Sequence, residues 1–135
     1  MSICLQVLLF GESQGGHVAA KMAARIRPDL LIFISSLPEP VDAEAIRRDD
    51  ITTVVGWKVV RSYARASYIR KVACVRQAEE KYFGKRDAAL KAVESMGPRA
   101  FLARDRRGRH GSWNGYEVGR ITQEAWAWVE ANPRE

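Results

Sequence analysis

The chain has 135 residues, which is enough for one domain with a single hydrophobic core. Hydrophobic residues make up 47% of it, and this share excludes a disordered or low-complexity chain. The formal net charge of +6 is basic without being extreme, so charge alone assigns no nucleic-acid partner.

Targeting and redox features also narrow the class of protein. The apolar run over residues 3–10 is too short to cross a bilayer, and no charged segment precedes it as in a signal peptide. Cys4 and Cys74 have neither disulfide nor metal-ligand spacing, so we interpret them as buried thiols. We therefore expect a cytoplasmic protein with no membrane segment, no metal and no organic cofactor.

The first part of the chain predicts a strand–helix–strand unit. Residues 3–10 are apolar apart from Gln6, as in a central parallel strand buried on both faces. Residues 14–27 predict a helix that Pro28 stops, with three large apolar side chains at four-residue spacing: Val18, Met22 and Ile26. Residues 29–36 predict a second buried strand, which completes a right-handed crossover.

The middle of the chain reads as mostly helical. Residues 42–50 favour a short helix with Asp42 as its cap, and residues 51–60 are either a strand or the entry to the next helix. Residues 61–83 and 85–96 predict two further helices, the second with Ala89, Leu90 and Val93 facing inward.

The end of the chain predicts a strand, a loop and a closing helix. Gly97-Pro98 ends the preceding helix, and residues 99–104 predict a short strand. A charged loop over residues 105–114 precedes a helix over 116–131, whose inward side chains are predicted to be Val118, Ile121, Ala125, Trp128 and Val129. The fold class is thus α/β, with a short parallel sheet of three to four strands, flanking helices and a helical insertion, all in one domain over residues 1–135.

The motif Gly-x-Ser-x-Gly occupies residues 11–15, between the first apolar run and the alanine-rich helix. Such a motif has a chemical meaning when a strand precedes it and a helix follows it. The tight turn would expose the Ser13 hydroxyl as a nucleophile, with Gly11 and Gly15 placed where a Cβ would clash. The backbone N–H of Gln14 would point at a developing oxyanion.

Residues 11–17, Gly-Glu-Ser-Gln-Gly-Gly-His, resemble the nucleophile elbow of the α/β-hydrolase family, with Gly16 as a third elbow glycine. The order of predicted elements resembles the second half of that fold, and residues 41–97 are a candidate for its helical cap. The resemblance implies further strands before the elbow, so both a fragment and a smaller fold stay open. A glycine-rich turn that packs a helix on a sheet or binds phosphate is the alternative, although the charge of Glu12 argues against phosphate.

A serine nucleophile needs a base, and the chain has two histidines. His17 lies one turn beyond Ser13 on the same helix, so we interpret it as a helix-face residue. His110 lies in the loop before the last helix, which is the slot that the resemblance assigns to the catalytic histidine. The carboxyl ends of parallel strands share one edge of a sheet, so this loop can reach the elbow.

The carboxylate that would orient the imidazole has several candidates. Asp42 follows the second strand, where some members of the resembled family place the acid, and Glu39 is close to it. Asp105 follows the last strand, but its neighbours Arg104, Arg106 and Arg107 favour an ion pair instead. The sequence does not choose among them.

A weaker resemblance nominates the same serine and histidine. Small SGNH-type esterases open with a strand and a Gly-Asp-Ser block, and their histidine precedes Gly-Tyr near the end. Here residues 11–13 and His110, followed by residues 115–116, stand at similar positions. Their Gly-x-Asn-Asp block is missing, and Arg107 replaces the aspartate expected before the histidine.

A basic segment gives the competing signal. Residues 58–86 carry nine Lys or Arg and two Glu, with Tyr63 and Tyr68 among them. The basic residues surround the predicted helix, so we interpret them as a solvated face and expect no nucleic-acid partner.

The sequence therefore predicts a serine hydrolase that cleaves an ester, thioester or amide in a small acyl substrate. The alternative is a non-catalytic α/β remnant, or a basic module that binds nucleic acid or an acidic partner. An exposed edge at the first or second strand would favour self-association or a partner chain. The substrate, the triad acid and the oligomeric state are left open.

Overall fold

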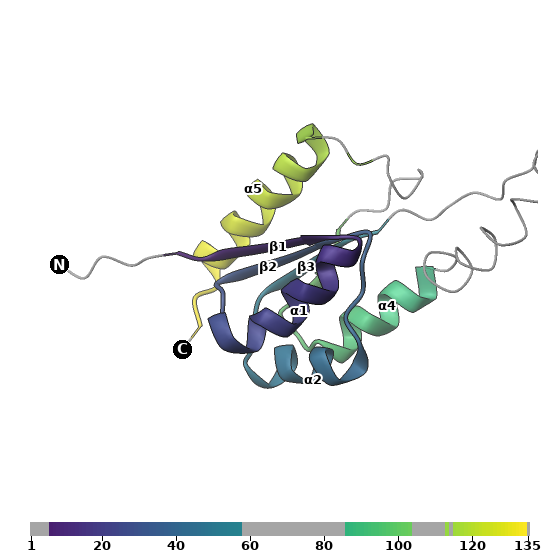
Figure 1. Ribbon diagram of the computed structural model, residues 1–135. Helices are drawn as coiled ribbons and strands as arrows, with labels where there is room; N and C mark the ends of the chain where they lie inside the picture. The colour runs from purple at the N-terminus through teal and green to yellow at the C-terminus, as the bar shows by residue number, and fades with distance from the viewer. Residues whose placement is uncertain (1–5, 58–85, 104–112, 114, 135) are drawn as a thin grey trace, which may run out of the picture.

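Four parallel strands form one sheet in the order β1-β2-β3-β4 (Figure 1). The computed structural model describes residues 6–57, 86–103, 113 and 115–134. The strands are β1 (Leu8–Glu12), β2 (Leu30–Ile34), β3 (Thr53–Gly56) and β4 (Ala100–Leu102). The sequence-based prediction of an α/β fold with a short parallel sheet is confirmed.

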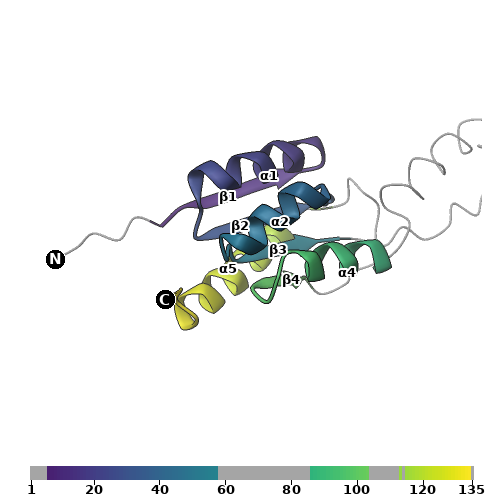
Figure 2. The same ribbon diagram turned by 90° about the horizontal axis from the view of Figure 1, so that it is seen from below.

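Helices cover both faces of this sheet (Figures 1 and 2). Three lie on one face, namely α1 (Gln14–Ile26), α2 (Pro40–Arg48) and α4 (Arg86–Ser95), and α5 (Gly115–Ala131) lies on the other. Because side chains alternate along a strand, the sheet contributes side chains to two hydrophobic cores, one on each face. Leu31, Phe33 and Val55 face the three helices, whereas Leu30 and Ile32 face α5.

The central strands are β2 and β3, and every residue of both is buried. The prediction that the first apolar run is a central strand buried on both faces is wrong. The run contributes β1, which begins only at Leu8 and lies at the end of the strand order, with Leu8 and Phe10 exposed. An apolar run does not reveal how many neighbours a strand has.

The buried face of α1 consists of its small residues. Gly16, Ala19, Ala20 and Ala23 are buried, whereas the bulkier Val18, Met22 and Ile26, which recur at four-residue spacing, are exposed. Small residues let the helix axis approach the sheet closely, so the bulky side chains point away from it. The helix ends with Arg27 in the left-handed conformation, before Pro28.

Two further predictions need correction. The second helix begins at Pro40 with Glu39 in the cap position, so Asp42 lies in its first turn and is not its cap. In α4, Ala89 is buried and Val93 packs on the core as predicted, but Leu90 is exposed. The short strand before α5 matches the prediction. Of the predicted inward side chains of α5, Val118, Ile121, Ala125 and Val129 pack on the core, whereas Trp128 stacks against Phe101 and Arg99. Trp126, which was not predicted, also packs on the core.

The proposed cap over residues 41–97 is too wide. This range includes most of α2 and all of β3 and α4, which belong to the sheet domain itself, since α2 packs on α1 and β3 pairs with β2. Residues 58–85 of this range fall outside the described residues, as do the predicted helix over 61–83, most of the basic segment and both cysteines.

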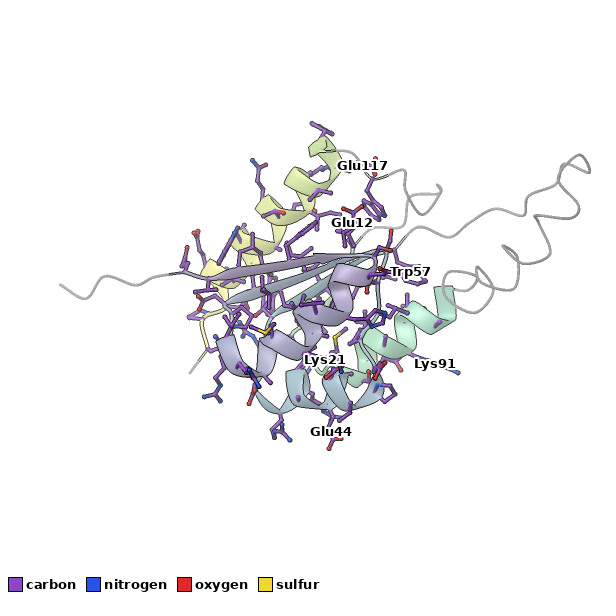
Figure 3. All side chains as sticks on the ribbon, viewed as in Figure 1. Glu12, Lys21, Glu44, Trp57, Lys91 and Glu117 are labelled. Carbon is purple, nitrogen blue, oxygen red and sulfur yellow. The ribbon has the colours of Figure 1, made fainter. Side chains whose placement is uncertain are left out.

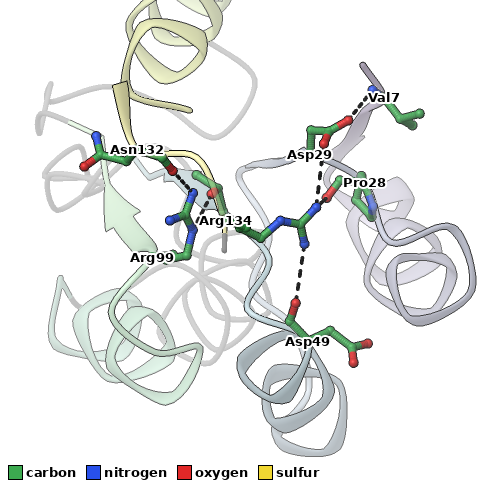
Figure 4. A network of polar contacts seen from close by, with 8 residues as sticks. Val7, Pro28, Asp29, Asp49, Arg99, Asn132 and Arg134 are labelled. Atoms are coloured by element: carbon green, nitrogen blue, oxygen red, sulfur yellow. Dashed lines mark hydrogen bonds and ion pairs between the residues drawn. The ribbon is translucent and has the colours of Figure 1, made fainter. Parts of the chain in front are cut away.

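A polar network ties the C-terminal end of the chain to the amino ends of the strands (Figure 4). Arg99, just before β4, donates to the Thr52 hydroxyl and the Asn132 carbonyl, and its guanidinium stacks 4.7 Å from the Trp128 ring centroid. Arg134 lies 3.6 Å from the Asp29 carboxylate, which accepts a hydrogen bond from the Val7 N–H.

The helices of the described residues contain no segment with the length and hydropathy of a membrane span.

Candidate active site

Ser13 stands between β1 and α1 with a left-handed backbone, φ 53° and ψ −121°. Residues other than glycine adopt such angles at a cost of about 1–3 kcal/mol, and they concentrate at functional sites. Two hydrogen bonds hold the turn, because the Ser13 N–H donates to the Ile34 carbonyl over 2.9 Å and the Gly16 N–H donates to the Ser13 carbonyl over 3.0 Å. The sequence-predicted sharp turn after the first strand is therefore present at residue 13.

The glycines around the turn are not equivalent. A Cβ on Gly11 would lie 2.6 Å from the Gly16 Cα and 2.7 Å from the Gly15 carbonyl oxygen. A Cβ on Gly16 would collide with the Ser36 side chain, whereas one on Gly15 would have nothing within 4 Å. The prediction that Gly11 and Gly15 are both required for space is thus right for Gly11 and wrong for Gly15, because the crowded position is Gly16.

The Ser13 side chain does not cap the helix that it precedes, since no side-chain capping hydrogen bond is formed at this position. The residue is half-buried, at the carboxyl edge of the parallel sheet, where α/β proteins hold ligands. Gln14 is the first residue of α1 and is exposed. Its N–H belongs to the first helical turn, whose amide groups have no carbonyl partner within a helix.

A comparison with Ser35 separates backbone strain from accessibility. Ser35 follows β2, also has a left-handed φ of 53°, and donates its N–H to the Gly56 carbonyl over 2.9 Å. The two serines are therefore held by equivalent contacts at the ends of neighbouring strands. Ser35 is buried and is followed by a loop, whereas Ser13 is half-buried and is followed at once by a helix.

Ser36 is a polar side chain that the sequence analysis did not single out. Its hydroxyl is buried against Gly16 and has no hydrogen-bond partner among the described residues. Its position in the Ser-Ser-Leu-Pro-Glu loop over residues 35–39 gave no sign of this contact, which depends on the path of the chain after β2.

The candidate partners of Ser13 are placed as follows. Asp42 lies in α2, and its carboxylate is 3.6 Å from the Lys21 ammonium. Lys21 lies eight residues beyond Ser13, which corresponds to about 12 Å along a helix axis. The structure thus engages Asp42 in a contact with the middle of α1 and does not bring it to Ser13. His17 is exposed on α1. His110 and Asp105 fall outside the described residues.

Glu117 is a further carboxylate at this end of the molecule, and the sequence analysis missed it. It lies in the first turn of α5, is half-buried, and has a buried Oε2. Figure 3 shows Glu12, Trp57 and Glu117 toward the carboxyl end of the strands. Its place directly after the histidine loop was the signal that could have identified it.

An apolar cavity of about 300 Å³ lies between α5 and the β3–β4 edge. Its aromatic lining comprises Phe101, Trp113, Tyr116 and Trp128, with Glu117, Arg120 and Glu124 as charged residues. Ser13 does not line it. Among the described residues, no group of three or more His, Cys, Asp or Glu could hold a metal ion.

Comparison with known proteins adds no relative. No family model, no curated protein and no solved structure matches this chain.

Proposed function

We propose that the chain is a serine hydrolase of the acyl-transfer type, with Ser13 as the nucleophile. The observation that carries the proposal is the Ser13 backbone, whose left-handed φ is fixed by the hydrogen bond to β2 directly before a helix N-terminus. A strained serine at a strand–helix junction is the geometry that a nucleophile elbow requires. The strand order β1-β2-β3-β4, with helices on both faces, supports the α/β-hydrolase resemblance of the sequence.

The proposed reaction proceeds in two steps. The Ser13 hydroxyl attacks the carbonyl carbon of an ester, thioester or amide, while His110 accepts its proton and returns it to the leaving group. The acyl-serine formed in this way is then hydrolysed by water that the same imidazole activates. The Gln14 N–H stabilises the oxyanion in both steps, and the reaction requires no metal or organic cofactor. A cytoplasmic location belongs to the same proposal.

One oxyanion donor is a weak basis for catalysis, since removing a single donor costs hydrolases about a hundred- to a thousandfold in rate. We therefore expect slow turnover from the chain alone, and the first test measures covalent labelling instead. A fluorophosphonate probe, which reacts with activated serines, should label the wild-type chain, and Ser13→Ala should reduce labelling to the background of denatured protein.

Ser35→Ala is the matched control, because Ser35 has the same φ and an equivalent main-chain hydrogen bond. Labelling should survive this change. Loss of labelling in both variants, or none in the wild type, would contradict the proposal. In the second case, salt-sensitive retention on a nucleic-acid column would support the basic binding module.

The acid can be tested by the same assay. Because Asp42 contacts Lys21 in the middle of α1, Asp42→Asn should leave the labelling rate within about twofold of wild type, as expected for a group outside a triad. Asp105→Asn and Glu117→Gln then compete for the role, and the variant that lowers the rate by about a hundredfold or more identifies the orienting carboxylate. A loss of that size in Asp42→Asn would show that the Lys21 contact is not maintained in solution.

A further inference from the structure

Among the described strands, β1 has a neighbour, β2, on one side only. The Ser13 N–H points inward, to the Ile34 carbonyl, and the Val7 carbonyl accepts a hydrogen bond from the Leu30 N–H. Since main-chain direction alternates along a strand, the groups of Leu9 and Gly11 also point to β2. The N–H and C=O groups of Leu8, Phe10 and Glu12 therefore point away from the sheet, and no strand in the described part of the chain pairs with them.

Large apolar side chains are exposed on both sides of this edge. On the α5 side, Leu8 and Phe10 are 39% and 41% exposed, because α5 packs on β2 and β3. On the α1 side, Met22 and Ile26 are 37% and 40% exposed. Lys21 contacts α2, so by helical periodicity Met22 and Ile26 lie on the opposite flank, toward the free edge. A strand with an unpaired edge between two exposed apolar surfaces has the composition of a protein–protein interface.

A second copy of the chain does not fit this edge. Symmetric pairing of two β1 strands is antiparallel around an axis perpendicular to the sheet, which puts both α1 helices on the same face. The strands would be about 4.8 Å apart, whereas packed helices need about 8–10 Å between their axes. In Figure 2, α1 lies over β1 and toward its free side, and Gly11 packs directly against the helix, so the two helices would collide.

A two-fold axis along the strands fails for a different reason. This axis would place the two β1 strands parallel to each other, with Phe10 of one copy directly opposite Phe10 of the other. A parallel ladder needs an offset of one residue between outward-pointing groups, so this symmetry leaves the hydrogen bonds unmatched. Neither two-fold arrangement therefore allows two copies of β1 to pair into one continuous sheet.

We propose that the β1 edge binds an apolar β-strand of a partner polypeptide, which extends the sheet beneath the overhanging α1. One face of that strand packs against Met22 and Ile26 and carries no helix. A helix of the partner covers its other face together with Leu8 and Phe10. Glu12, which is exposed at the carboxyl end of this edge, selects a strand with a basic residue near that end.

Hydrogen exchange tests the edge without knowledge of the natural partner. In the unfused chain, the amides of Leu8, Phe10 and Glu12 should exchange faster than those of Leu9 and Gly11, at every protein concentration. The probe is an alternating Val-Thr strand joined to the N-terminus by a flexible Gly-Ser linker, which supplies the strand at high effective concentration. It should slow the three edge amides by about tenfold or more, relative to a fusion with an all Gly-Ser segment.

Matched surface variants locate the contact. In the Val-Thr fusion, Met22→Lys should reduce the protection, whereas Val41→Lys, which replaces an exposed apolar residue on α2, should leave it unchanged. Edge amides that are already protected in the unfused chain, protection that rises with concentration alongside a dimeric mass, or no effect of the fused strand would each overturn the proposal. Ser13→Ala should behave as wild type here, which separates this test from that of the proposed hydrolase.

Discussion

At the scale of single residues, Ser13 combines a strained backbone with a position at the start of a helix. With φ 53° and ψ −121°, it occupies a region that glycine enters freely and serine does not. Such strain persists only if the surrounding contacts fix it, and the hydrogen bond to the Ile34 carbonyl is one of these contacts. The conformation thus reduces stability while it presents the hydroxyl.

The substitution Ser13→Gly separates these two effects. Because glycine relieves the strain, we expect the free energy of unfolding to rise by about 1 kcal/mol, measured by urea denaturation. Labelling by the fluorophosphonate should vanish in the same variant. A destabilised Ser13→Gly protein would show that the serine side chain holds the turn together, which would remove the argument from strain.

The elbow glycines allow a second prediction at this scale, because they differ in their surroundings. In Gly11→Ala the new Cβ meets the backbone of Gly15 and Gly16, and overpacking of this kind costs about 1–3 kcal/mol. In Gly15→Ala the Cβ meets nothing within 4 Å, and the helix gains propensity, so stability should rise by up to about 1 kcal/mol. Equal effects of the two changes in urea denaturation would contradict the described packing.

At the scale of elements, the sequence predicted most of the strands and helices but not which faces they bury. The five apolar residues of β2 mark a central strand, and Pro28 and Gly97-Pro98 mark helix ends correctly. The run that contains β1 looks the same in sequence, yet that strand is an edge, because burial depends on neighbours far along the chain. In α1 the four-residue spacing of Val18, Met22 and Ile26 does not mark the core face, because close approach to the sheet buries the alanines.

The candidate site was predictable to the same extent. The turn at Ser13 is local, so its Gly-x-Ser-x-Gly pattern sufficed to find it. The close contact between Gly16 and Ser36 joins α1 to the loop after β2, twenty residues further along the chain, and no local pattern indicates it. The position of Asp42 beside Lys21 likewise follows from how α1 and α2 pack. Asp42 was a candidate for the orienting acid because it follows the second strand, and this order in the sequence does not reveal the contact of its carboxylate.

The contact between α1 and the loop after β2 can be measured with a double-mutant cycle. Gly16→Ala should cost about 2 kcal/mol because its Cβ collides with Ser36, whereas Ser36→Gly removes both the obstacle and a buried hydroxyl without a described partner. The double variant should recover at least about 1 kcal/mol relative to the sum of the single changes. Strict additivity in urea denaturation would show that the two positions do not touch.

At the scale of the whole molecule, the domain is held more firmly at one edge than at the other. At the β4 edge, Phe101 packs edge-to-face on Trp128, and Arg99 links β3, β4 and the end of α5. At the β1 edge, no described strand pairs with the outer side of β1, and Leu8 and Phe10 are exposed. The stability of the isolated chain should therefore depend strongly on the contacts at the β4 edge. Association with a partner should depend on the β1 edge.

Arg99 gives the last prediction, because it is the residue through which three elements meet. Arg99→Ala removes two hydrogen bonds and the stacking on Trp128, and it leaves the Thr52 hydroxyl without its donor, so we expect a loss of about 2–4 kcal/mol. Its matched control is Arg120→Ala on α5, where the only described contact is an exposed pair with Glu124 that is worth about 0.5 kcal/mol or less.

Salt distinguishes the two arginines further. The Arg99 contacts are partly buried, so the loss in Arg99→Ala should persist at high ionic strength, whereas the small effect of Arg120→Ala should disappear. If both variants lost stability equally, or if the effect of Arg99→Ala were abolished by salt, the end of α5 would not be anchored through this side chain. The anchoring of α5 matters for the candidate site because the segment that carries His110 directly precedes this helix in the sequence, so a loosened α5 should also slow the labelling of Ser13.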